Sequence, residues 1–153
     1  MTHRTCVRRT GPTRRLTAIR GNERLRPWYQ SVPRELRDSS RYLVEARRHG
    51  VPVDVLRPDI VLRWDGPGGR RWLIVEAKLG DVSFQSGRLI EGSPHAALKD
   101  LLMYRTDFSH VLHGATTYGL GIAWGAELTP QPGEILLASP DAVGDALSLW
   151  GVV

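Results

Sequence analysis

Residues 57–80, RPDIVLRWDGPGGRRWLIVEAKLG, constrain the fold of this chain more than any other stretch. Two runs rich in β-branched and aromatic residues, 59–64 and 71–78, stand on either side of the turn-forming segment 65–69. Such runs around a Gly/Pro cluster are typical of a β-hairpin. We therefore expect two antiparallel strands joined by a tight turn.

The register of this hairpin predicts a cluster of charged side chains. A turn centred near Gly68 pairs Asp59 with Glu76, and two carboxylates opposite each other in a ladder repel. Because side chains alternate between faces along a strand, Glu76 and Lys78 lie on the same face. Asp59, Glu76 and Lys78 are thus expected to form one cluster, which contains the cation that the two acids need.

This cluster suits a divalent cation. Two carboxylates and the backbone carbonyl of Ala77 supply the oxygen ligands that Mg²⁺ prefers, while water and a phosphate oxygen fill the other positions. Lys78 would lie beside an attacking water, where it could orient or deprotonate that water or neutralise charge on phosphorus. Arginine could not serve as the base. The alternative is an ordinary hairpin in which Lys78 makes a surface ion pair with Asp59 or Glu76.

Pro58-Asp59 on one strand and Glu76-Ala77-Lys78 on the next resemble the active-site signature of the PD-(D/E)XK nucleases, which have the restriction-endonuclease-like fold. The resemblance implies a Mg²⁺- or Mn²⁺-dependent phosphodiester hydrolase, an endonuclease that acts on nucleic acid, with DNA the expected substrate, and leaves a 5′-phosphate. It implies that Asp59, Glu76 and the Ala77 carbonyl hold the metal and that Asp59, Glu76 and Lys78 are catalytic. It also implies a homodimer or a larger restriction or defence assembly.

The segment between Pro33 and Gly50 is predicted to be a helix without interruption over 34–49. Its apolar stripe includes Tyr42. In the resembled superfamily the helix before the sheet often brings a further acid to the metal, and Glu35 is the first candidate by its facing, with Glu45 the second. An ordinary first-turn acid, favoured by the helix dipole, explains Glu35 equally well.

A second helix is predicted to open at Ser93-Pro94 and to run to about Phe108. Arg105 falls inside its apolar stripe and therefore needs an anion, either the acidic cluster or a substrate phosphate. Tyr104 resembles the tyrosine that approaches the site in restriction-subunit-like nucleases. The alternative is a core tyrosine beside an arginine that extends to solvent.

The remaining elements predict an α/β fold with a mixed central sheet flanked by helices. Strands are expected at 51–56, 117–124 and 134–138, followed by a helix at 140–150. Glycines at 119 and 121 indicate a bend or a close approach of the backbone. The order of elements between 33 and 124 matches the αβββαβ core of the resembled superfamily.

Charge divides the chain unevenly. Residues 1–26 carry eight arginines and one glutamate, whereas the rest holds 13 basic and 15 acidic residues. We expect residues 1–27 to form a disordered basic arm that attracts nucleic-acid phosphates, and 28–153 to form the nuclease-like domain. A poorly ordered terminus without a role is the alternative for the arm.

Further predictions follow from the cysteine count and hydropathy. The single Cys6 and the lack of a long apolar run predict a cytoplasmic protein without a membrane partner. Two other interpretations stay open. One is a catalytically silent nucleic-acid-binding or scaffold domain with the nuclease fold, against which the intact Asp59, Glu76 and Lys78 argue. The other is a fragment of a larger restriction or defence protein.

Overall fold

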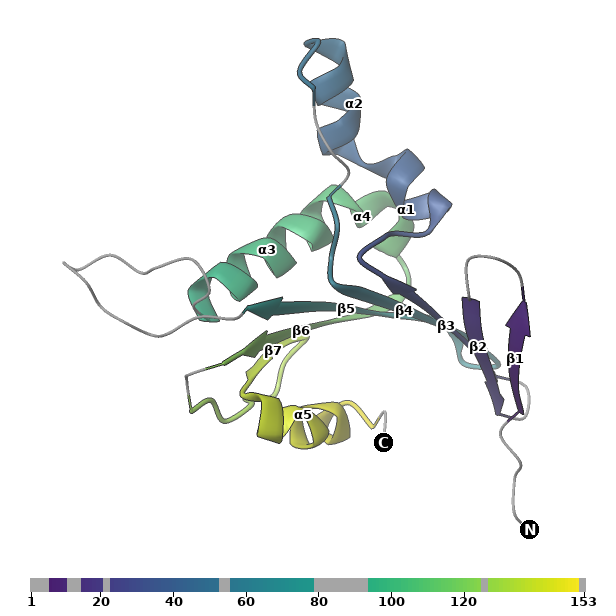
Figure 1. Cartoon of the computed structure of the whole chain (residues 1–153), viewed down its shortest axis with the longest axis vertical. Helices are drawn as coiled ribbons and strands as arrows, with labels where there is room; N and C mark the ends of the chain where they lie inside the picture. Colours follow the sequence, from purple (N-terminus) through teal and green to yellow (C-terminus); the bar gives the residue numbers. More distant parts are fainter. Residues whose placement is uncertain are drawn as a thin grey trace, which may run out of the picture. The chain divides into compact units, whose positions relative to one another are not determined.

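The computed structural model describes residues 6–10, 15–20, 23–52, 56–78, 94–124 and 127–151. The chain divides into two compact units. The first unit comprises residues 1–73 and 107–117, and the second unit comprises residues 74–106 and 118–153. Strand β5 begins in the first unit and ends in the second (Figure 1).

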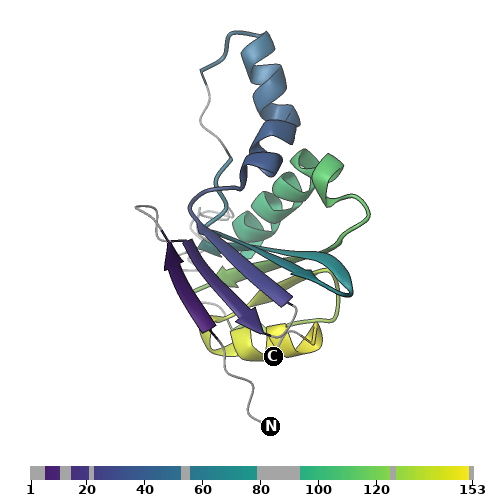
Figure 2. The same cartoon turned by 90° about the vertical axis from the view of Figure 1, so that its right-hand side faces the viewer.

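The first unit is built on strands in the order β1-β2-β3-β4-β5. Their bounds are β1 Cys6–Thr10, β2 Arg15–Arg20, β3 Glu23–Tyr29, β4 Ile60–Gly66 and β5 Gly69–Lys78. Neighbours from β1 to β4 pair antiparallel, and Figure 2 shows β1, β2 and β3 side by side. The register of β3 with β4 runs from Arg24 opposite Asp65 to Tyr29 opposite Ile60.

The expectation of a disordered arm over residues 1–27 is wrong for the described residues, which form β1, β2 and most of β3. Strand β3 pairs edge to edge with β4 and places Leu25 opposite Trp64 and Trp28 opposite Val61, so apolar residues lie side by side on the two strands. Arginine and apolar residues alternate from Arg24 to Pro27, which is the period of a strand. The high positive charge concealed this pattern.

The predicted hairpin of β4 and β5 is present, with Pro67 and Gly68 as its two-residue turn. Gly69 has φ +93°, a conformation that favours glycine because a Cβ atom would clash with the backbone. The strand predicted at 51–56 is not confirmed: residues 53–55 lie outside the described part, and the described residues beside them are not in a strand. Strand β3 instead pairs with β4.

The described part of the first unit also contains three helices: α1 Arg34–Ser39, α2 Arg41–Arg48 and α4 Ser109–Leu112. The prediction of one uninterrupted helix over 34–49 is wrong, because Ser40 is extended (ψ 115°) between α1 and α2. The Ser40 hydroxyl accepts a hydrogen bond from the Leu43 amide at 3.1 Å and so caps α2. The break also leaves Tyr42 exposed, although the predicted stripe included it.

The second unit contains the end of β5, most of β6 Thr116–Ala123, and β7 Ile135–Ala138, in the order β5-β6-β7. Strands β6 and β7 are parallel. Helix α3 Pro94–Asp107, the 3-10 turn η1 Pro140–Ala142 and helix α5 Val143–Leu149 accompany them, and α5 lies beside β7 (Figure 1). The predicted elements from 94 to 150 are thus confirmed to within about two residues, apart from the additional helix α4.

Gly121 explains how closely α3 approaches β6. A Cβ atom at Gly121 would lie 3.2 Å from Cβ of Ala97 on α3 and 2.5 Å from Cδ2 of Leu137 on β7. The prediction of a close approach at this strand is confirmed. Ala97 and Leu101 on the same helix face are fully buried, so α3 is held firmly against the strands.

The α/β class predicted from the sequence is confirmed, and the pairing is mixed: antiparallel from β1 to β4 and parallel between β6 and β7. Across the described ranges, no helix has the length and apolar character needed to span a bilayer.

Candidate active site

Strand β5 ends in two charged residues after an apolar run. Glu76 follows four buried residues, and its own side chain is only 6% exposed. A buried carboxylate is unfavourable without a partner of opposite charge. Lys78 provides that charge, with its Nζ 2.6 Å from Oε1 of Glu76. The predicted placement of Glu76 and Lys78 on one face is confirmed.

Asp100 on α3 completes this arrangement. Its Oδ2 lies 2.7 Å from Nζ of Lys78, so one ammonium joins two carboxylates. The Lys78 and Asp100 side chains are 24% and 18% exposed, which leaves the group accessible from solvent on one side. We call Glu76, Lys78 and Asp100 the Lys78 triad.

The backbone around the Lys78 triad is fixed by the sheet and by α3. The amide of Trp124, just after β6, donates to the carbonyl of Lys78 at 3.2 Å. Asp100 stands next to the fully buried Leu101 and one helical turn before the buried Tyr104. Since both elements are anchored by packing, the three charged groups are held in place by rigid parts of the second unit.

Opposing effects act on the pKa of Lys78. Burial disfavours the ammonium and acts to lower the pKa, but the hydrogen bonds that Lys78 donates to Asp100 and Glu76, together with the negative charges of these two residues, outweigh burial. The net result is a pKa raised above the ordinary lysine value of 10.5. Lys78 is therefore a cation in the neutral pH range.

Asp59 belongs to the first unit, whereas Glu76, Ala77 and Lys78 belong to the second. Asp59 stands directly before β4, half-buried, and its carbonyl accepts a hydrogen bond from the Gln30 amide at 2.8 Å. The structure thus brings Glu76 and Lys78 together. The predicted pairing of Asp59 with Glu76, and the metal contact of the Ala77 carbonyl, stay predictions.

Glu35 on α1 has a buried cation as its neighbour. Nη1 of Arg63 donates to Oε1 of Glu35, and Arg63 is only 9% exposed. Glu45 on α2 is exposed and lies 3.7 Å from Arg48. A structural role thus accounts for the position of Glu35 in the first unit, and its contact with a metal stays a prediction.

Arg105 and Tyr104 lie at the end of α3. Arg105 is paired with Glu134, the residue before β7, and among the described ion pairs it has no contact with Glu76 or Asp100. Tyr104 is buried, which agrees with the alternative of a core tyrosine. A contact of either residue with substrate stays a prediction.

Asp100 was not among the residues predicted for the site. It lies at one border of the buried stripe of α3, while Arg105 lies at the opposite border. Tyr104 follows Asp100 by four positions, and this spacing puts both on the same side of a helix. The sequence alone shows this spacing of Asp100 and Tyr104. It does not indicate which border of the α3 stripe lies next to Lys78.

The Glu76 carboxylate and the Ala77 backbone carbonyl have the oxygen donors that suit a hard cation such as Mg²⁺ or Mn²⁺. Within the described ranges, however, no three His, Cys, Asp or Glu side chains come together as a metal-binding group. The chemistry of these donors therefore fits, and a complete metal site at the end of β5 stays a prediction.

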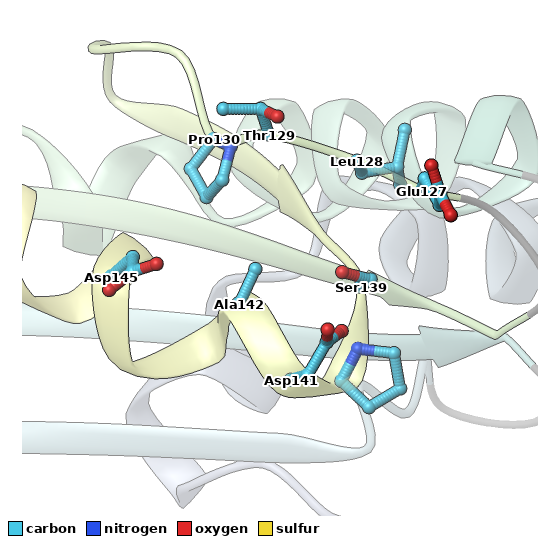
Figure 3. Close-up of a pocket in the computed structure, with 9 residues that line it drawn as sticks. Glu127, Leu128, Thr129, Pro130, Ser139, Asp141, Ala142 and Asp145 are labelled. Carbon is cyan, nitrogen blue, oxygen red and sulfur yellow. The ribbon is translucent and has the colours of Figure 1, made fainter.

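A separate pocket of about 490 Å³ lies in the second unit (Figure 3). It is formed by residues 127–130 and by the segment that leads into α5. Its charged lining residues are all acidic: Glu127, Asp141 and Asp145. Phosphates are repelled by such a lining, so this pocket does not suit a nucleic-acid backbone.

No protein-family model, curated protein or solved structure matches this chain. The resemblance to the PD-(D/E)XK nucleases is therefore carried by the residues of the signature, Pro58-Asp59 and Glu76 to Lys78. The αβββαβ order stays a prediction, because the strand expected at 51–56 is not seen in the described residues.

Proposed function

We propose that this chain is a metal-dependent nuclease with a restriction-endonuclease-like core, which hydrolyses phosphodiester bonds in DNA and leaves 5′-phosphates. The observation that supports this most strongly is the pairing of Glu76 with Lys78 at 2.6 Å, at the buried end of β5. A buried acid and an amine two residues apart on one strand face are what the E-x-K part of the signature requires. The role of Asp59 in this proposal rests on the Pro58-Asp59 part of the sequence signature.

In this proposal Glu76, the Ala77 carbonyl and Asp59 hold Mg²⁺ or Mn²⁺. The bound ion would supply positive charge that polarises the scissile phosphate and lowers the pKa of an attacking water. Glu76 suits the role because the packed strand β5 fixes its backbone and its burial limits its conformations.

Lys78 has the donors that phosphate chemistry needs. An ammonium carries three N–H groups, and among the described residues two carboxylates, Glu76 and Asp100, lie within hydrogen-bond distance of it. A further N–H can meet a phosphate oxygen or orient the attacking water. The positive charge of Lys78 then stabilises the charge that develops on the phosphoryl oxygens.

The same geometry supports a second candidate function. Two acids that share one ammonium are paired without any metal, as in a purely structural ion network. On this basis the chain would be a catalytically silent nucleic-acid-binding or scaffold domain. Cleavage assays separate the two candidates.

Nucleic acid is the proposed partner in both cases. The eight arginines of residues 1–26 lie in the segment that contains β1, β2 and the start of β3. Binding through arginine–phosphate contacts releases counterions, so affinity should fall steeply as salt rises. A cytoplasmic location, and a homodimer or a larger restriction or defence assembly, belong to the same proposal.

The test is cleavage of supercoiled plasmid with Mg²⁺, with Mn²⁺ and with chelator. We expect wild type and the control Lys99→Met, which alters the only other lysine, to nick the plasmid only with metal. Glu76→Gln and Lys78→Met should lose at least about 100-fold in rate. The new ends should accept a label from polynucleotide kinase only after phosphatase treatment.

Two results would count against the nuclease. Undiminished cleavage by Glu76→Gln would mean that the activity does not depend on this acid. A wild-type protein that binds DNA but cleaves none with either metal would favour the silent binding domain.

A further inference from the structure

We propose that Asp100 is a positioning residue that holds the Lys78 ammonium where it meets the substrate phosphate or the attacking water. This inference rests on the proposed nuclease function and extends its site to α3. The observation behind it is the 2.7 Å separation between Oδ2 of Asp100 and Nζ of Lys78.

A lysine side chain needs more than one anchor to have a defined position. Its four-carbon stem rotates freely, and a single ion pair leaves the ammonium free to swing about the partner. Glu76 provides one anchor from the same strand, 2.6 Å away. Asp100 provides the second from a different element, so the two carboxylates together define where Nζ lies.

Asp100 is suited to this task because α3 cannot easily move. The neighbouring Leu101 and the preceding Ala97 are fully buried, and Gly121 lets the helix approach β6 closely. The backbone of Asp100 is therefore held in a fixed position, from which its carboxylate reaches Lys78 at the end of β5. Misplacement of a reacting group by about 1 Å can cost about 100-fold in rate, so this rigidity matters for catalysis.

The second anchor has a particular value in the proposed reaction. If Glu76 were to hold the metal, its carboxylate oxygens would be shared between the metal ion and the Lys78 ammonium. Asp100 then still holds Lys78, because its own carboxylate is not among the predicted ligands. Without Asp100 the ammonium would be drawn to Glu76 alone and away from the substrate.

The first test measures the lysine directly and needs no activity. The chain has two lysines, Lys78 and the exposed Lys99, so reductive methylation followed by peptide mass spectrometry reports each one separately. We expect Lys78 in the wild type to react about tenfold more slowly than Lys99, since two charged hydrogen bonds must break. Asp100→Asn, which preserves the shape of the side chain, should speed the methylation of Lys78 several-fold and leave the methylation rate of Lys99 unchanged. Equal Lys78 rates in wild type and variant would overturn the proposal.

The second test is a double-mutant cycle on cleavage. Asp100→Asn should lower kcat about tenfold with little change in KM, and Asp100→Glu should recover part of the loss because it restores a carboxylate. In a Lys78→Met background, Asp100→Asn should have no further effect. Additive losses would show that Asp100 acts independently of Lys78 and would also overturn the proposal.

The two tests separate the inference from the proposed function. If the wild type cleaves nothing, the nuclease proposal fails, while the methylation rates still decide whether Asp100 holds Lys78. A thermal unfolding curve for Asp100→Asn, together with its Lys99 rate, shows whether that variant is folded. If it is not, Asp100→Ala, which removes the carboxylate and favours a helix, takes its place in the methylation test. Its Lys78 should be methylated at a rate close to that of Lys99, and a rate unchanged from wild type would be decisive against the proposal.

Discussion

Arg63 on β4 donates a hydrogen bond to the carboxylate of Glu35 on α1, from a position where its own side chain is only 9% exposed. Asp65 gives a second carboxylate, 2.9 Å from Nε of Arg63. The rings of Trp28 and Trp72 lie 5.8 Å and 5.7 Å from its guanidinium carbon. Arg63 is thus the buried cation around which the first unit places its acids and tryptophans.

Replacing Arg63 should therefore destabilise the first unit. Arg63→Met leaves Glu35 and Asp65 without their shared cation, and we expect a loss of about 2–4 kcal/mol in unfolding free energy. Arg70→Met is the matched control, because Arg70 also pairs with Asp65 and lies over Trp72 but is exposed. The loss of unfolding free energy in Arg70→Met should stay below about 1 kcal/mol. Urea unfolding measures both, and equal losses would refute the special role of Arg63.

Stability should depend on pH through Lys78. Its pKa is raised in the folded protein, so the stabilisation from its ion pairs is fully present below the unfolded pKa near 10.5. It is lost as pH rises through the higher folded pKa. We expect wild type to be about 1–3 kcal/mol more stable than Lys78→Met at neutral pH, with the gap narrowing above pH 10.5 or so.

Urea unfolding from pH 7 to the alkaline limit tests this dependence. Lys99→Met is the control, since Lys99 is exposed and its substitution should give a small difference that does not change with pH. A wild-type advantage over Lys78→Met that persists unchanged at high pH would contradict the ion-pair account.

Gly121 should not tolerate a side chain. In Gly121→Ala the Leu137 side chain can rotate away, but Ala97 can yield only if α3 moves, so we expect a loss of about 1–3 kcal/mol. Gly144→Ala is the control: it lies in α5 with no atom within 4 Å of an added Cβ, and should gain about 0.5–1 kcal/mol. Thermal unfolding of both variants decides, and a stabilised Gly121→Ala would disprove the close packing.

Ser40 should contribute measurably to the start of α2. Ser40→Ala removes the acceptor of the Leu43 amide in a buried position, and a loss of about 1 kcal/mol is expected. Ser39→Ala removes only the partly buried hydrogen bond to the Leu36 carbonyl, so its effect should be smaller, about 0.5 kcal/mol. Chemical denaturation compares them. Equal effects would mean that Ser40 is not a significant cap.

Local signals predicted much of the fold. The Gly/Pro cluster located the turn between β4 and β5, Pro94 marked the start of α3, and the glycines of β6 indicated close packing. These features depend on neighbours in sequence, and the physical rules for turns, caps and close packing act over short distances. The break at Ser40 was missed because uninterrupted helical periodicity hides a serine that turns to cap the next helix.

What could not be predicted depends on contacts between distant segments. Strand β3 was hidden by its arginines, because charge suggests disorder until the partner strand β4 is known. In the same way, Asp100 and Arg105 border the same stripe of α3, and only the packed structure shows that Asp100 meets Lys78 while Arg105 meets Glu134. The pairing of Glu76 with Lys78 was predictable because two residues on one strand determine it.

The most direct test of the nuclease proposal is to titrate Mn²⁺ into wild type and Asp59→Asn by calorimetry and to assay the same samples for plasmid nicking. The proposal predicts that wild type binds the ion and nicks DNA, and that Asp59→Asn binds it at least about tenfold more weakly and loses cleavage. Wild-type binding and nicking in Asp59→Asn would contradict the proposal, because the signature acid would then serve neither the metal nor the reaction.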